Sequence, residues 1–151
     1  MANQPRTYSF LNVKASITGP NGTFSLGSGA GVAEEGITLE FVEPKNTQTT
    51  GADGTYMHSL HAAKAGKATV RLLKNSNTNA LLSAMYNADT SNPATHGQNV
   101  ILVTDMLAID VATGVGCAFM QHPTVTYSKD GAMLEWAWNI GKLDFMLGAG
   151  L

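Results

Sequence analysis

Four histidines are the side chains of this sequence best suited to bind a metal ion. His58 and His61 are three positions apart, a spacing that brings two ligands together on a helix but puts them on opposite faces of a strand. The pattern around them is extended, so we do not expect them to share an ion. His96 and His122 fall in separate predicted loops without a cysteine or carboxylate at ligand spacing. The sequence predicts no metal site and no cofactor.

Other motifs that could carry chemistry are incomplete. Gly27–Gly31 resembles half of a nucleotide-binding loop, but the strand-like segment Gly36–Glu43 follows it where a helix should begin at the phosphate. Asp53 and Gly54 lack the alternating carboxylates of an EF-hand. The remaining acidic residues form no recognisable motif with a histidine and a serine. We therefore expect a protein that is not an enzyme.

Charge is scarce in this chain of 151 residues. Asp, Glu, Lys and Arg make up 13% of it, about half of the roughly 25% that is usual in soluble domains. Either other copies of the chain cover much of its surface, or Thr, Ser, Asn and Gly provide that surface instead. The net charge is −2 and no Lys or Arg run occurs, which disfavours tight binding of nucleic acid. No segment is apolar for long enough to span a membrane.

Alternation of apolar and polar residues predicts a single domain, residues 1–151, of mainly antiparallel β structure. In Thr7–Thr18 every second residue from Leu11 to Ile17 is apolar, as in a half-buried strand. Near the end of the chain, Leu134, Trp136, Trp138 and Ile140 share one face of a predicted strand. Further strands are expected at 36–43, 56–62, 67–74, 99–111, 115–120 and 124–128, with turns at 112–114 and 129–131.

One helix and two long polar segments interrupt the strands. Ser76 is a predicted N-cap, and apolar residues between Leu81 and Tyr86 recur at helical spacing, which predicts a helix of about three turns. Pro44–Thr55 has no apolar periodicity and is predicted to be a long polar loop, a kind of segment that is usually functional or disordered. Asp89–Asn99 is predicted to be a second polar loop.

The centre of the chain carries a family resemblance. Thr69-Val70-Arg71-Leu72-Leu73 is followed by Ser76 and then by Asn79-Ala80-Leu81-Leu82. This order of a strand, a short polar break and a helix resembles the tail-tube proteins of contractile-tailed phages. The opening strand, the 36–43 strand and the closing hairpin are similar in order and spacing. The resemblance covers nearly the whole chain, and its specificity lies in the ordered combination.

The resemblance implies a fold of two packed antiparallel β-sheets with one flanking α-helix. It also implies hexameric rings that stack into a hollow tube in the virion, assembled in the bacterial host cytoplasm. The implied partners are further copies of the chain, the tail sheath protein, the baseplate and the tail terminator, with no membrane. The loop 44–55 would reach neighbouring subunits, and residues 1–7 and 145–151 would form stacking arms. The implied interface residues are Pro44, Lys45, Asn46, Gln48, Thr50, Asp53, Tyr56, Arg6, Phe145, Leu147 and Leu151.

A tube of this kind is geometrically reasonable. Four strands from each of six subunits would close a barrel of ~24 strands with a backbone diameter of ~48 Å, wide enough for a DNA duplex. Its lumen should be polar and not basic, so that genomic DNA passes without specific binding. The candidate lumen residues come from the polar faces of two different strands, which leaves the inward-facing sheet undecided: Asn12, Ser16, Thr18, Glu135 and Asn139.

Two other functions remain open. The tube of an R-type tailocin or of a type VI secretion system would have the same fold and a different cargo. A β-sandwich binding module of a virion is an alternative of another class. Exposed aromatic residues would favour that module, but Trp136 and Trp138 alternate with Leu134 and Ile140 as core residues do.

Overall fold

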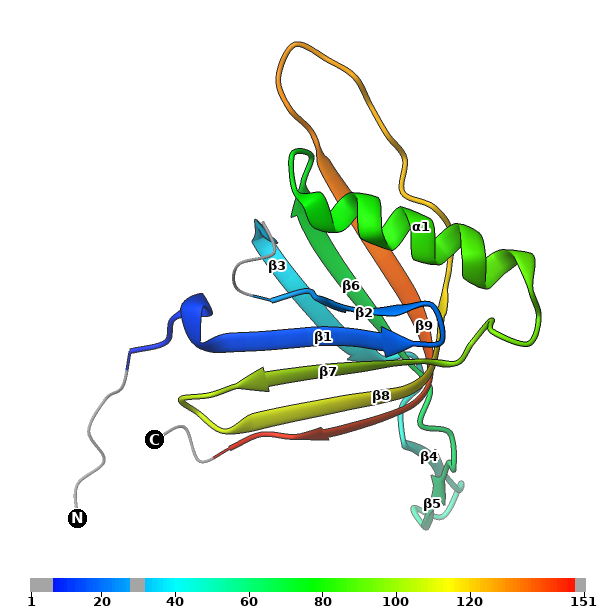
Figure 1. Cartoon of the computed structure of the whole chain (residues 1–151). Coiled ribbons are helices and arrows are strands. Elements are labelled where there is room, and N and C mark those ends of the chain that lie inside the picture. Colours follow the sequence, from blue (N-terminus) through cyan, green and yellow to red (C-terminus); the bar gives the residue numbers. More distant parts are fainter. Residues whose placement is uncertain (1–6, 28–31, 149–151) are drawn as a thin grey trace.

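The computed structural model of the chain describes residues 7–27 and 32–148, with the backbone alone at 32–35 (Figure 1). It confirms a mainly β fold with one α-helix. The elements in chain order are the 3₁₀ helix η1 (Phe10–Asn12), β1 (Val13–Gly19), β2 (Gly22–Ser25), β3 (Val32–Phe41), β4 (Asn46–Thr50), β5 (Tyr56–Leu60), β6 (Gly66–Leu73), α1 (Asn77–Ser91), β7 (Asn99–Asp105), β8 (Asp110–Phe119) and β9 (Met133–Met146).

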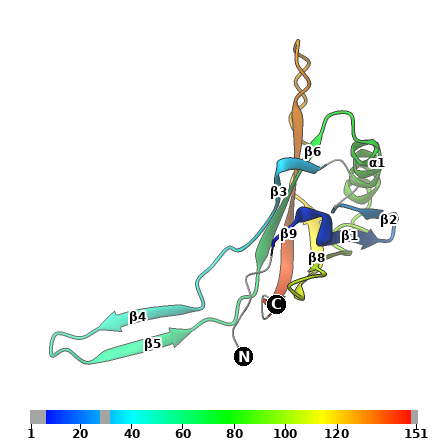
Figure 2. The same ribbon diagram turned by 90° about the vertical axis from the view of Figure 1, so that its left-hand side faces the viewer.

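Seven of the strands form one antiparallel sheet in the order β2-β1-β7-β8-β9-β6-β3, and β4 pairs with β5 alone. The long strand β9 belongs to both halves of this sheet. Its first part, Met133–Ile140, pairs with β6, and its second part, Trp138–Met146, pairs with β8. The sheet curls along β9, so that β1, β7 and β8 form one layer and β3, β6 and the start of β9 form the other (Figures 1 and 2). The two predicted sheets are therefore two halves of one curled sheet.

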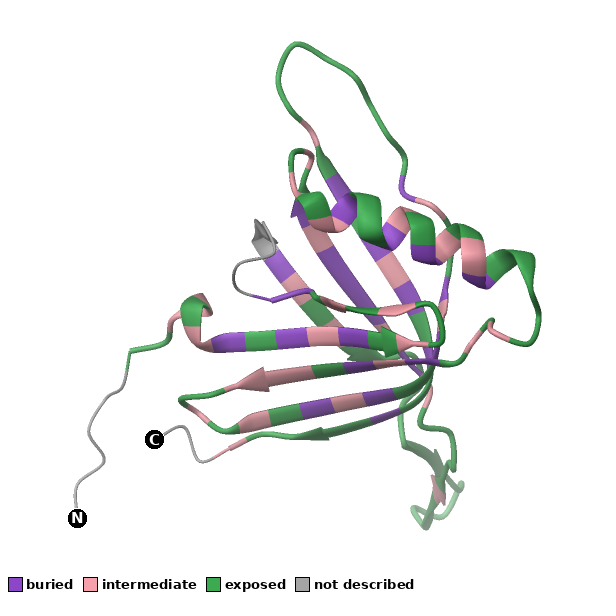
Figure 3. Ribbon diagram, in the orientation of Figure 1, coloured by how far each residue is buried: buried purple, intermediate pink, exposed green. Residues whose placement is uncertain are grey.

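The core lies between these layers and under the helix (Figure 3). Leu134, Trp136, Trp138 and Ile140 are all buried, as their alternation predicts, and both tryptophans are fully covered. The ring of Phe119 on β8 contacts Trp136 and Trp138 at centroid distances of 5.9 and 5.3 Å. Because both indoles are internal, they cannot supply the exposed aromatic surface that a binding module would need.

The helix α1 covers the open end of the curled sheet. Ser76 is its N-cap, as predicted, and its side chain accepts a hydrogen bond from the Thr78 amide at 3.2 Å. The helix runs for 15 residues, about four turns, and is longer than the sequence predicts. Its last turn carries Asp89, which the sequence pattern places in a loop. Asp89 is buried and accepts hydrogen bonds from the Asn21 and Asn99 side chains, which explains a carboxylate on the buried face.

Two predictions for the segment 99–114 are wrong. The segment 99–111 is not one strand, because the chain turns between β7 and β8 at residues 106–109 and not at 112–114. The Asp105 carboxylate holds this turn by accepting hydrogen bonds from the amides of Leu107 and Ala108 at 3.0 and 3.3 Å. Gly114, expected in the turn, lies within β8, where a Cβ would meet the Ile140 side chain at 3.1 Å.

The predicted strand 124–128 is also wrong. Residues 120–132 form an extended loop between β8 and β9 that projects beyond the helix (Figure 1). Lys129–Gly131 lies within this loop and does not join two paired strands. His122 fixes its base, since its Nε2 lies 3.1 Å from the Ser83 hydroxyl and its ring packs edge-on against Trp136. In the part of the chain that the structure describes, no helix is long and apolar enough to cross a membrane.

Candidate assembly surfaces

The predicted polar loop 44–55 is in fact most of a β-hairpin. β4 and β5 pair antiparallel from Asn46↔Leu60 to Thr50↔Tyr56. Backbone hydrogen bonds and exposed side-chain contacts, such as the 2.7 Å contact between the Thr47 hydroxyl and His61 Nε2, hold this pairing without a buried face. A search for apolar periodicity therefore misses it. Figure 2 shows the hairpin standing away from the curled sheet, and every side chain in it except Ser59 is exposed.

The hairpin brings together most of the interface residues that the family resemblance implies. Asn46, Gln48, Thr50 and Tyr56 lie on one face of it, and Lys45 and Pro44 lie at its base. The same face also carries His58 and Leu60, which the sequence analysis did not select. These two residues could have been found from the sequence, because Tyr56, His58 and Leu60 are every second residue of one strand and so share a face. Met57 lies on the opposite face, beside Thr49.

The tip of the hairpin is a tight turn closed by Asp53. The Gly51 amide donates to the Thr55 carbonyl at 2.7 Å, and Gly54 adopts φ 88°, which favours glycine. The Asp53 carboxylate accepts hydrogen bonds from the Thr55 hydroxyl at 2.6 Å and the Thr55 amide at 3.1 Å. These bonds lower the pKa of Asp53, so the tip carries a fixed negative charge.

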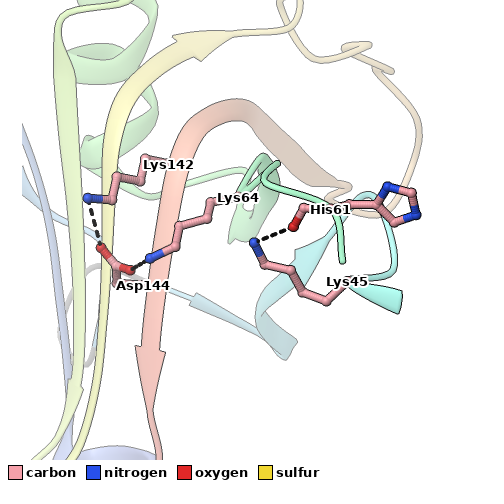
Figure 4. Close-up of polar contacts among 5 residues, drawn as sticks. All are labelled: Lys45, His61, Lys64, Lys142 and Asp144. Carbon is pink, nitrogen blue, oxygen red and sulfur yellow. Dashed lines mark hydrogen bonds and ion pairs between the residues drawn. The ribbon is translucent and has the colours of Figure 1, made fainter. Parts of the chain in front are cut away.

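The base of the hairpin is held by ion pairs and hydrogen bonds, and Figure 4 shows those that its side chains make. The Lys45 ammonium donates to the His61 carbonyl at 3.0 Å, which joins the two strands where they leave the body. The Lys64 ammonium lies 2.9 Å from the Asp144 carboxylate on β9, and the Lys142 ammonium lies 3.9 Å from it. The hydrogen bond from Lys64 lowers the pKa of Asp144. The Leu143 amide donates to the Lys64 carbonyl at 2.8 Å. These contacts set the direction in which the hairpin projects.

A groove of about 410 Å³ lies beside this base. Phe145, a predicted arm residue, lines it together with Phe41 on β3. The strand β9 continues to Met146, so the predicted C-terminal arm, 145–151, begins inside the sheet and not after it. Leu147 follows directly and is exposed. The predicted interface residues Arg6 and Leu151 lie outside the described residues.

Four of the five candidate lumen residues divide between the two layers. Ser16 and Thr18 are on the outward face of β1, whereas Glu135 and Asn139 are on the outward face of β9. Asn12 is half-buried in η1 and its carbonyl accepts the Met106 amide. The outward faces of the two layers point in opposite directions. One channel can therefore be lined by Ser16 and Thr18 or by Glu135 and Asn139, but not by both pairs.

The two outward faces differ in chemistry. On the β9-β6-β3 face, Glu135 pairs with Arg71 at 3.3 Å, and Lys67 lies opposite Glu40 in the strand register, so each of these two cations has a carboxylate beside it. The outward face of β7 and β8 instead exposes three aliphatic side chains. These are Leu102, Val111 and Val115.

Comparison with protein families identifies this architecture. The family model of the bacteriophage PhiTE tail tube protein matches residues 6–148. The chain belongs to this tail tube family. Tail tube proteins are structural components of the phage tail, which confirms that the chain is not an enzyme. A search of curated proteins finds no match.

Solved structures of contractile injection machines share the tail tube fold. A chain in the six-fold symmetrised anti-feeding prophage baseplate is similar with a TM-score of 0.61 and 9% identity, covering 100% of each chain. The extended sheath-tube complex of an extracellular contractile injection system gives 0.57 and 10%, covering 93% of this chain and 92% of the other. The anti-feeding prophage tube-terminating cap gives 0.55 and 11%, covering 98% and 95%.

Proposed function

We propose that this tail tube protein forms hexameric rings that stack into the inner tube of a contractile phage tail and that genomic DNA leaves through the channel. The observation that carries this proposal is the β4–β5 hairpin, which stands away from the body with almost all of its side chains exposed. A two-stranded hairpin is marginally stable on its own in water. It therefore needs a surface on another molecule, and neighbouring subunits of the same tube are the nearest source.

The ends of the curled sheet support ring formation. β3 and β2 are the outermost strands of the seven, so each has one edge without a partner strand in the described part of the chain. Unpaired strand edges bind other strands, and closing a ring of subunits removes them. Edge pairing between neighbours would continue one sheet around a central channel.

The β9-β6-β3 face is the better candidate for the lumen wall. Among its described side chains, Arg71 pairs with Glu135 and Lys67 lies opposite Glu40, so it offers DNA phosphates no cluster of unpaired positive charge. The helix α1 lies on the opposite side of this layer, where a tube has its outer wall (Figure 2). This choice selects Glu135 and Asn139 over Ser16 and Thr18 as lumen residues. The outer wall would then meet the tail sheath, and the ends of the tube would meet the baseplate and the terminator.

Negative-stain electron microscopy of the purified protein tests the proposal. We expect rings or hollow rods of uniform diameter from the wild-type chain. Deleting Gln48–Ala52 removes three of the five residues of β4 and the start of the turn, and it should abolish these assemblies. Circular dichroism and thermal melting should be almost unchanged, because the deleted residues do not contact the core. Normal assembly of the deletion variant would refute the role of the hairpin.

The similarity to injection-system tubes keeps one other function under consideration, a tube that carries a cargo other than DNA. The family model favours the phage tail. Particles isolated from the native host distinguish the two, since a phage tail ends at a DNA-filled capsid and an injection particle has none.

A further inference from the structure

Large apolar side chains gather at the end of the molecule where β7 turns into β8. Six of them are at least 62% exposed, although soluble monomers rarely leave a large continuous apolar patch uncovered. We call this surface the terminal patch. It consists of Tyr8, Leu11, Met106, Ile109, Met146 and Leu147.

Three separate parts of the chain meet in the terminal patch. Val13↔Asp105 in the β1–β7 register places the residues before β1 beside the β7–β8 turn, and the Met106 amide donates to the Asn12 carbonyl at 3.0 Å. Val111↔Met146 places the end of β9 beside the start of β8. The Gly148 amide donates to the Asp110 carboxylate at 2.6 Å. These ties make the patch one continuous end of the molecule (Figure 1).

Ile109 is held in an unfavourable backbone conformation within this patch. Its φ of 63° is the single positive value among the described residues other than glycine, and a β-branched side chain is sterically strained there. The Ile109 amide donates to the Asp105 carbonyl at 2.8 Å, which fixes the turn. Its side chain is 68% exposed, so contacts within its own molecule do not account for an isoleucine. Glycine or asparagine would fit this backbone better.

The size of the terminal patch fits a protein partner. Six large side chains with on the order of 100 Å² exposed each present on the order of 600 Å² of apolar surface. A stable interface buries about 800 Å² on each side, so the patch would provide most of one side. We propose that the terminal patch is the docking site for the β4–β5 hairpin of a second copy of this chain. This inference rests on the proposed tube assembly and names the surface that receives the hairpin.

The hairpin is complementary to the patch in its chemistry. It exposes Tyr56 and Leu60 on one face, and residues 46–60 carry a single charged residue, Asp53 at the tip. Because hairpin and patch are different surfaces of one chain, their contact is head-to-tail and can repeat from copy to copy. Patch-to-patch contact would instead give a two-fold dimer that stops growing. Only the head-to-tail arrangement builds a tube.

Substituting Ile109→Asn tests the site without the ambiguity of a folding defect. Asparagine accepts positive φ, so we expect the melting temperature of the unassembled subunit to stay the same or rise. Losing one buried apolar side chain at the interface should raise the subunit concentration needed for assembly by roughly ten- to hundredfold. Ile109→Val is the matched control, because it keeps the apolar contact and the strain, and it should assemble close to wild type.

Disulfide cross-linking then tests which surface occupies the patch. In a His58→Cys, Ile109→Cys double variant, with the first cysteine on the face that carries Tyr56 and Leu60, mild oxidation of assembled protein should give a ladder of covalently linked chains on a non-reducing gel. The native Cys117 is buried and does not interfere. The proposal would be overturned by dimers without a ladder, by a link within one chain or by no link. Normal assembly of Ile109→Asn would also overturn it. A wild-type chain that forms no assemblies would instead refute the proposed function itself.

Discussion

Polar groups inside this small β protein are few, and several of them connect two elements. The Trp136 indole nitrogen donates to the Asn79 side chain at 3.0 Å, and the Asn79 amide donates to the Leu73 carbonyl at 2.8 Å. This chain of hydrogen bonds holds the start of α1 against β6 and β9. At the other end of the helix, Asp89 accepts from Asn21 and Asn99 and so ties the helix to the β1–β2 turn and to β7. The helix is thus fixed to the sheet at both ends.

Cys117 offers a test of the core that depends on pH. Burial raises the pKa of its thiol from 9.0 to about 11. The folded state keeps the thiol neutral, so the stability this gives is complete below pH 9 and is lost as the pH rises toward 11, where the unfolded chain ionises first. We expect iodoacetamide at pH 8 to leave the native protein unlabelled and to alkylate the chain in concentrated urea. Native labelling at the urea rate would show that β8 opens to solvent.

The position of a residue could be predicted from the sequence where the residues next to it in the chain determine that position. Trp136 and Trp138 alternate with aliphatic residues, and the hydroxyl of Ser76 precedes a helical pattern, so burial and capping follow from local rules. Asp89 and Ile109 could not be placed in this way. Asp89 is buried because amides from two distant segments reach it, and Ile109 takes a glycine-like φ because hydrogen bonds to Asp105 hold the turn.

At the scale of elements, β9 is a strand that sequence patterns predict well, and the β4–β5 hairpin is one that they miss. β9 buries one face, and its alternation makes it predictable over its first eight residues. The hairpin buries neither face, so polar residues such as Asn46–Thr50 suggest a loop while the backbone forms a strand. The role of this segment at the subunit interface stays a prediction. The structure shows that the segment is a hairpin with a fixed base and not a loop.

The base of the hairpin should depend on Asp144. Asp144→Asn removes its ion pairs with Lys64 and Lys142, and because all three side chains are largely exposed, the melting temperature should hardly change. Amide hydrogen exchange at 61–65 and at Leu143 should become faster as the base loosens. The same loosening should appear in the wild type when the pH falls below the lowered pKa of Asp144, since this contribution is present only while the carboxylate is ionised. Asp130→Asn, in the 120–132 loop, is the control. Unchanged exchange in Asp144→Asn would show that the backbone hydrogen bonds suffice.

At the scale of the whole molecule, low charge and exposed apolar surface have one common explanation. The chain is 13% charged, and it leaves the hairpin, the terminal patch and two strand edges without cover in its described residues. Each of these is costly for a monomer and useful for a subunit that neighbours surround. The scarcity of charged residues in the composition is consistent with a covered surface but fits an uncharged polar surface equally well. The positions of the surfaces depend instead on how β9 folds the sheet over, which no local pattern encodes.

The orientation of the subunit in the tube determines which layer of the curled sheet lines the channel. If the β9-β6-β3 layer lines the channel, a gold cluster on an Asn139→Cys variant should appear as density on the tube axis in electron micrographs. The label should react at this site alone, because Cys117 is buried. The same cluster on a Thr18→Cys variant, from the outward face of the other layer, should add density away from the axis or prevent assembly. Axial density from Thr18→Cys and none from Asn139→Cys would reverse the assignment. The uncharged face of β7 and β8 would then be the wall that DNA meets.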